Sequence, residues 1–221
     1  MPTALITGAS RGIGAAIATA LAPTHTLLLA GRPSPALQAT AERLGATTLP
    51  LDLTDTDAIP AVTRSIGELD VLVHSAGVSF PGRVAESTVE QWRTTFEVNL
   101  VGAVALTLVL LPALRRTGGQ AVFINSGSGR KASLKMASYS ASKFALRAFA
   151  DSLRESEPSL RVTSVYPGRT DTDMQRELVS FEGGDYDPEK FLRPDTVAEA
   201  VAHAVATPPD GHLHEVVIRP R

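Results

Sequence analysis

The sequence predicts a single α/β domain with a doubly wound, mostly parallel sheet and helices on both faces. Short apolar segments alternate with helix-forming segments along the chain, which is typical of a parallel sheet with crossover helices. The first apolar segment, residues 4–7, breaks into a glycine-rich turn that opens a helix. The length of 221 residues fits one such domain, and no break in composition suggests a second. The expected domain therefore covers residues 1–221.

Each expected element follows from a local pattern of apolar residues. Strands are expected at residues 4–7, 26–30, 47–51, 71–73, 120–124, 161–166 and 215–218. Helices are expected at residues 15–21, 36–44, 138–149 and 194–206, and residues 89–114 should form one long helix or two in succession. Asp55 is the better N-cap candidate for the segment that begins near residue 54. Residues 173–193 have weak periodicity and mixed charge, which suits a mobile lid over a substrate.

The composition excludes several classes of function. The formal net charge is −2 and no dense run of lysine and arginine is present, which argues against a nucleic-acid-binding surface. The absence of cysteine excludes disulfides, thiolate nucleophiles and thiolate metal sites, and no metal site is expected. The chain starts without the features of a secretory signal, and the apolar residues 100–111 are too short to span a bilayer. We therefore expect a cytoplasmic protein without a membrane partner.

The turn after the first strand has the features of a phosphate-binding loop. Its glycines permit a tight turn and let a pyrophosphate approach the backbone, while the free N–H groups at the start of the helix favour negative charge. The candidate cofactor-binding residues of this turn are Gly8, Ser10, Arg11, Gly12, Ile13 and Gly14. A glycine motif alone is weak evidence, but this one stands between a strand and a helix, as dinucleotide binding requires.

Tyr139 and Lys143 are candidates for proton transfer. On the expected helix they lie one turn apart on the same face. A free phenol titrates near pH 10, and a cation roughly 4 Å away would lower the phenol pKa by up to about three units. The alternative is an ordinary helix on which both side chains face solvent, and that alternative is favoured when the pair is taken alone. The remaining motifs favour the catalytic interpretation.

Several motifs in this order resemble those of the short-chain dehydrogenase/reductase family. They are Thr7-Gly8-x-x-x-Gly12-Ile13-Gly14, Asp52-Leu53, Ala76-Gly77, Asn99, Ser126, Tyr139-x-x-x-Lys143, and Pro167-Gly168 with Thr172. The resemblance extends over nearly the whole chain and implies a single-domain Rossmann fold. It departs from the family at His74-Ser75, where the usual sequence is Asn-Asn, so hydrogen bonds expected from two Asn side chains must be replaced by His74 and Ser75, or lost.

The resemblance implies a role for each matching residue. Tyr139 would be the acid/base, Ser126 would bind the substrate oxygen, Lys143 would lower the Tyr139 pKa and hold the nicotinamide ribose, and Asn99 would support Lys143 through its backbone and a water. Asp52 and Leu53 would meet the adenine, and Ala76 and Gly77 the ribose. Pro167, Gly168, Thr170 and Thr172 would lie along the nicotinamide.

The end of the second strand indicates the preferred cofactor. A carboxylate at this place accepts the ribose hydroxyls of NAD, whereas a cation accommodates the 2′-phosphate of NADP. This chain has no acid there; Arg32 offers a guanidinium group, and Arg11 could reach the same phosphate. We expect NADP(H) to be preferred over NAD(H). The alternative is that Arg32 is only a surface residue in a proline-containing loop.

The expected function is that of an oxidoreductase that interconverts a small-molecule ketone or aldehyde and its alcohol by direct hydride transfer. The alternatives are a dehydratase or epimerase on the same fold and a non-catalytic NADP(H)-sensing protein. Arg130, Lys131 and Lys135 could attract an anionic substrate or simply form a solvated loop. The apolar residues 100–111 and the face of Phe144 and Ala148 resemble the paired-helix interface of the family, so a homodimer or homotetramer is expected.

Overall fold

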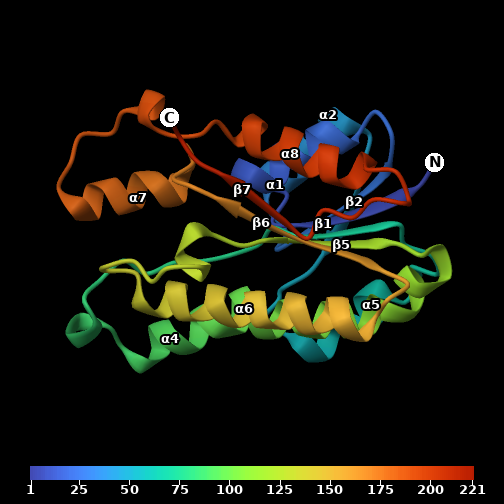
Figure 1. Ribbon diagram of the computed structural model, residues 1–221, viewed down its shortest axis with the longest axis horizontal. Coiled ribbons are helices and arrows are strands. Elements are labelled where there is room, and N and C mark those ends of the chain that lie inside the picture. Colours follow the sequence, from blue (N-terminus) through green and yellow to red (C-terminus); the bar gives the residue numbers. More distant parts are fainter.

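The computed structural model describes residues 1–221 and contains one seven-stranded parallel sheet with helices on both faces (Figure 1). The strand order is β3-β2-β1-β4-β5-β6-β7. The strands are β1 (Thr3–Thr7), β2 (Thr26–Gly31), β3 (Thr47–Pro50), β4 (Val71–His74), β5 (Gln120–Ile124), β6 (Arg161–Pro167) and β7 (Glu215–Ile218). All seven predicted strands are present, with ends shifted by at most one residue.

Two helical layers cover the sheet. Figure 1 shows α1 (Gly12–Leu21), α2 (Pro35–Leu44) and α8 (Pro194–Ala206) on one face, and α4 (Val89–Phe96), α5 (Gly102–Thr117) and α6 (Ala137–Ser156) on the other. A short helix, α3 (Ile59–Thr63), packs against α5. Each layer encloses its own apolar core, of 20 and 19 buried residues. Because both faces are covered, the central strands are apolar on both sides, which explains the short continuous apolar runs.

The predicted lid contains a helix that its weak periodicity did not indicate. α7 (Asp173–Glu182) is capped by the Thr172 side chain, which accepts a hydrogen bond from the Gln175 N–H at 3.3 Å. It ends at Gly183, which has a left-handed φ of 73°. Only two of its ten residues are buried, and this is why its apolar pattern is weak.

The predicted helix of residues 89–114 is one continuous helical run with a π turn at its centre. α4 continues into a π turn at Glu97–Val101 and then into α5. Asn99 lies inside this π turn. By length and composition alone, the run Val89–Thr117 is apolar enough to cross a membrane. In the fold, however, Leu106 and Leu110 of α5 are buried in the core beneath the sheet.

The strand order places a crevice beside the glycine turn. β1 lies between β2 and β4, so consecutive crossovers leave β1 in opposite directions and open a space at the carboxyl ends of these strands. Gly8 has a φ of 67°, and a Cβ there would lie 2.7 Å from Ala76 Cα. A Cβ on Gly14 would overlap the Gly8 carbonyl oxygen. Both positions therefore require glycine for the turn to pack against α1 and β4.

Candidate active site

A single cleft of about 1640 Å³ at the carboxyl edge of the sheet collects the predicted site residues. Its walls include every predicted cofactor-binding residue and, of the four catalytic candidates, Ser126, Tyr139 and Lys143. Asn99 does not line the cleft and lies behind its wall. Residues separated by more than 130 positions along the chain are thus brought together, because the carboxyl ends of all seven parallel strands point to the same edge.

The glycine turn presents an open helix end to the cleft. Arg11 is the N-cap residue of α1 and makes no side-chain capping bond, so the first N–H groups of the helix remain free. Gly12 has a φ of 57°, and a Cβ there would lie 3.3 Å from Thr172 Cγ2. The Arg11 guanidinium forms an ion pair with Asp173 of α7 at 2.9 Å. This edge of the cleft can therefore accept an anionic group that approaches the backbone closely.

Asp52 and Arg32 lie at the end of the cleft beyond the glycine turn. Hydrogen bonds from the Thr54 N–H (2.9 Å) and hydroxyl (2.8 Å) lower the pKa of Asp52, and the nearby Arg32 contributes to this shift. Asp55, the predicted cap, accepts from the Ala58 N–H at 3.2 Å. Arg32 forms no ion pair and remains available to a ligand.

Tyr139 and Ser126 meet in the cleft wall. Both side chains line the cleft, and the Ser128 N–H donates to Ser126 Oγ at 3.1 Å. Loss of solvation raises the pKa of Tyr139, and the Ser126 hydroxyl group opposes this rise. Tyr139 is therefore a protonated hydroxyl group in the protein without ligand, and it can donate to an oxygen atom placed in the cleft.

The structure corrects the predicted effect of Lys143 on the Tyr139 pKa. Lys143 is 4% exposed, and its Nζ donates to the Ile124 carbonyl oxygen at 2.8 Å, with the Tyr139 ring centroid 5.7 Å away. Burial lowers the pKa of Lys143 to about 8, whereas the pKa of Tyr139 is raised. The expected depression is absent because burial of the phenol raises its pKa, while the Lys143 ammonium is directed at a carbonyl oxygen and has itself lost solvation.

Asn99 joins α6 to the loop that follows β4. Its Oδ1 accepts from the Val78 N–H at 2.8 Å, and its Nδ2 donates to the Val78 carbonyl (2.9 Å) and to Ser142 Oγ (3.0 Å). A Cβ on Gly77 would lie 3.3 Å from Asn99 Oδ1 and 3.8 Å from Lys143 Nζ. Asn99 is thus close to Lys143, while support through its backbone and a water stays a prediction.

The turn at His74-Ser75 is held through its backbone by Thr7. Thr7 Oγ1 accepts from the N–H groups of Ser75 (3.0 Å) and Ala76 (3.2 Å). His74 is buried, stacks on Phe123, and approaches Thr107 Oγ1 with its Nε2 at 2.9 Å. His74 therefore contributes to the core under the site rather than to the cleft surface.

Sequence reasoning missed Asn125. This buried side chain donates to the Lys143 carbonyl oxygen at 3.1 Å and accepts from the Ser126 N–H at 2.8 Å. It therefore holds the Ser126 turn against α6. Its position directly before Ser126, at the end of a buried strand, was the available signal.

The basic loop after Ser126 does not act as one cationic patch. Arg130 pairs with Glu215 at 3.3 Å, and Lys135 Nζ lies 5.6 Å from the ring centroid of Phe181 in α7. Lys131 lines the cleft without an acidic partner. Ion pairs of Arg11 with Asp173 and of Arg169 with Glu182 (2.6 Å) hold the two ends of α7. Movement of α7 as a lid stays a prediction.

Comparisons with known proteins agree with this geometry. Residues 2–183 match the family model described as short chain dehydrogenase. An uncharacterised oxidoreductase of Staphylococcus epidermidis is 34% identical over 98% of this chain and 96% of its own length. Glycine betaine reductase of Emericella nidulans is also 34% identical, but the match covers 99% of this chain and only 18% of that protein.

Solved structures extend the likeness to the whole fold. An alcohol dehydrogenase from the archaeon Thermococcus sibiricus, complexed with 5-hydroxy-NADP, superposes with a TM-score of 0.90 and is 31% identical. The match covers 100% of this chain and 97% of that one. The Gly8–Gly14 turn, Ser126, Tyr139 and Lys143 share one cleft at the edge of a seven-stranded parallel sheet, and the chain is an oxidoreductase of the short-chain dehydrogenase/reductase family.

Proposed function

We propose that the protein interconverts a ketone or aldehyde and its alcohol by direct hydride transfer with NADP(H). The observation that carries this proposal is that Ser126, Tyr139 and Lys143 line the same cleft as the glycine turn. A protonated phenol beside a second hydroxyl group can donate to a carbonyl oxygen and stabilise the charge that develops there.

The cleft fits a dinucleotide. The glycine turn lacks the Cβ atoms that would block a pyrophosphate, and the free N–H groups of α1 favour its negative charge. Arg32 would bind the 2′-phosphate of NADP, since it is free of ion pairs and no acid replaces it at the end of β2. The archaeal relative bound to an NADP analogue supports the same choice. The nicotinamide group would supply or accept the hydride.

The residues of this chain would manage the proton and the orientation of the substrate. In reduction, Tyr139 donates its proton to the carbonyl oxygen while the Ser126 hydroxyl binds that oxygen. Lys143 has two ammonium hydrogens left after its bond to Ile124, and these would hold ribose hydroxyls. The positive charge of Lys143, whose Nζ lies 5.7 Å from the Tyr139 ring centroid, would stabilise the phenolate formed by proton transfer.

A cofactor-oxidation screen tests this proposal. The purified protein is incubated with NADPH and a panel of ketones and aldehydes, and the loss of absorbance of the reduced nicotinamide is followed. Oxidation that depends on both a carbonyl compound and the protein is the expected result. NADPH binding without any oxidation across the panel would favour a sensor, and cofactor that stays bound through purification without net oxidation would favour a dehydratase or epimerase.

We also propose that the protein forms a dimer or tetramer through α5 and α6. Leu108 (58% exposed) and Phe144 (42% exposed) are large apolar side chains on the outer surface of these helices. An apolar patch of this kind commonly marks a protein–protein interface. Size-exclusion chromatography with light scattering measures the assembly directly.

A further inference from the structure

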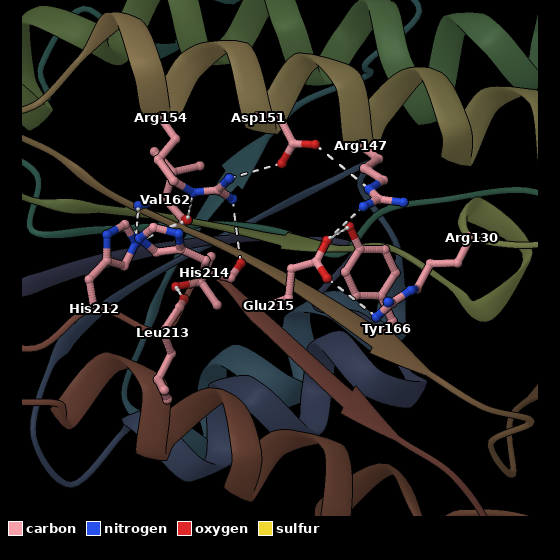
Figure 2. A network of polar contacts seen from close by, with 11 residues as sticks. Arg130, Arg147, Asp151, Arg154, Val162, Tyr166, His212, Leu213, His214 and Glu215 are labelled. Atoms are coloured by element: carbon pink, nitrogen blue, oxygen red, sulfur yellow. Dashed lines mark hydrogen bonds and ion pairs between the residues drawn. The ribbon is translucent and has the colours of Figure 1, made fainter.

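One carboxylate receives polar contacts from three of the segments that build the active site. Glu215, at the start of β7, binds Arg130 Nη1 at 3.3 Å and Arg147 Nη2 at 3.3 Å, and it accepts a hydrogen bond from the Tyr166 hydroxyl at 3.1 Å. Figure 2 shows Glu215 between these three side chains, with Asp151 and Arg154 farther along α6. Glu215 and its three partners do not line the cleft.

Each of the three partners stands next to a candidate site residue. Arg130 closes the 3₁₀ turn Gly127–Gly129 that follows Ser126, and its N–H donates to the Gly127 carbonyl at 3.1 Å. Arg147 lies one turn after Lys143 on α6. Tyr166 directly precedes the Pro167-Gly168 turn, and Arg130 lies over its ring at 5.2 Å from the centroid. The position of β7 can therefore affect, through Glu215, three segments that carry candidate site residues.

The contact between Glu215 and Arg130 reaches the outer end of the turn that carries Ser126. Its inner end is held by Asn125, which bonds the Lys143 carbonyl, but its outer end has Arg130 as its ionic anchor. Inside the turn, the Ser128 and Gly129 N–H groups donate to Ser126 Oγ and to the Ser126 carbonyl, at 3.1 and 2.9 Å. Release of Arg130 would leave the Ser126 hydroxyl free to move away from Tyr139.

We propose that Glu215 is a positioning residue for the reaction, because its contacts with Arg130 and Arg147 hold the outer end of the Ser126 turn near α6 and keep the Ser126 hydroxyl beside Tyr139. This inference rests on the proposed function, and it deepens that function by assigning a role to the last strand of the sheet. Loss of the Glu215 charge would leave the two positive charges of Arg130 and Arg147 uncompensated, and their repulsion would favour release of Arg130.

Two measurements on Glu215→Gln test the inference. The first is amide hydrogen exchange at Ser128 and Gly129, which needs no activity. We expect exchange to be roughly two- to fivefold faster, the range expected when a local opening is favoured by loss of a partly exposed ion pair. Unchanged exchange at both amides would overturn the inference.

The second measurement is the pH profile of kcat for alcohol oxidation, in which Tyr139 must accept a proton. The groups that face Tyr139 are Ser126 and Lys143, and the buried His74 lies near Lys143. Because the Ser126 hydroxyl group lowers the Tyr139 pKa, its movement away from Tyr139 should move the acidic limb of the profile to higher pH in Glu215→Gln, while the NADPH Kd stays unchanged. A general loss of stability would not move this limb, so an unmoved limb would contradict the proposal.

Asp151→Asn is the matched control. Asp151 pairs with Arg147 at 3.7 Å and with Arg154 at 2.9 Å but does not contact Arg130, so neither readout should change. A similar shift in this variant would overturn the inference, because the effect would then arise from the charge of α6 and not from the turn.

Arg130→Met provides a second variant if Glu215→Gln folds poorly. It removes the same contact while leaving Glu215 bonded to Arg147 and Tyr166, and it should reproduce both changes. The double variant should change the exchange rate and the acidic limb by no more than either single variant does. Additive changes would contradict action through one contact. If the wild-type protein oxidises no alcohol, the proposed function fails, but the exchange measurement still tests the position of the turn.

Discussion

The buried imidazole of His74 should make the stability of this protein depend on pH between pH 7 and pH 5. Burial, together with the nearby positive charge of Lys143, lowers the pKa of His74 to about 3. Thr107 Oγ1 donates to the Ala103 carbonyl at 2.8 Å, so His74 Nε2–H must donate to Thr107 and Nδ1 carries the lone pair. Nδ1 is buried without a partner. The folded protein therefore holds His74 neutral.

The sign and size of the effect follow from linkage. As pH falls through about 6.5, the unfolded chain binds a proton on this residue while the folded protein does not, so the folded state loses stability. Each pH unit below 6.5 costs about 1.4 kcal/mol until the folded pKa is reached, and the loss between pH 7 and pH 5 is about 2 kcal/mol. Above pH 6.5 the contribution is fully present.

Urea unfolding followed by circular dichroism at pH 7, 6 and 5 measures this loss in the wild-type protein and in His74→Phe. The phenylalanine ring can stack on Phe123 but cannot bind a proton, so the variant should lose about 2 kcal/mol less over this range. All other titratable residues contribute equally to the pH dependence of both proteins, so their contributions cancel in the comparison. Thr107→Val keeps the buried imidazole and should retain the full pH dependence. Parallel stability curves for the wild type and His74→Phe would refute the reasoning.

Four further outcomes are expected. Tyr139→Phe should lower kcat by about 10² to 10⁴ with NADPH binding retained, and near wild-type turnover would exclude Tyr139 as the acid. Arg32→Asp should lower kcat/KM with NADPH by about tenfold or more and shift preference toward NADH, as steady-state kinetics with both cofactors will show. Gly14→Ala should lower the free energy of unfolding by about 1–3 kcal/mol in a denaturant titration, because its Cβ meets the Gly8 backbone. Phe144→Glu should shift the elution volume in size-exclusion chromatography toward a monomer, and an unchanged volume would place the interface elsewhere.

Local patterns in the sequence were sufficient to predict the strands and the glycine turn. The alternation of apolar segments can be read from neighbouring residues. The turn requires glycine at Gly8 and Gly14 because a Cβ at either position would clash with nearby backbone where the strand meets the helix. The spacing of Tyr139 and Lys143 likewise gives one face of a helix without further information. The structure confirmed these features, and they were predictable because each depends on residues that are close together in the sequence.

The tertiary structure alone decided the electrostatics of the site. The pKa values of Tyr139 and Lys143 moved apart because burial, which involves distant segments, outweighs the proximity of two residues on one helix. The Glu215 contacts join residues 130, 147 and 166, and no local pattern can show that these residues meet. Solvent exclusion and long-range pairing are properties of the packed chain, so the sequence could name the candidate acid/base groups but not their protonation.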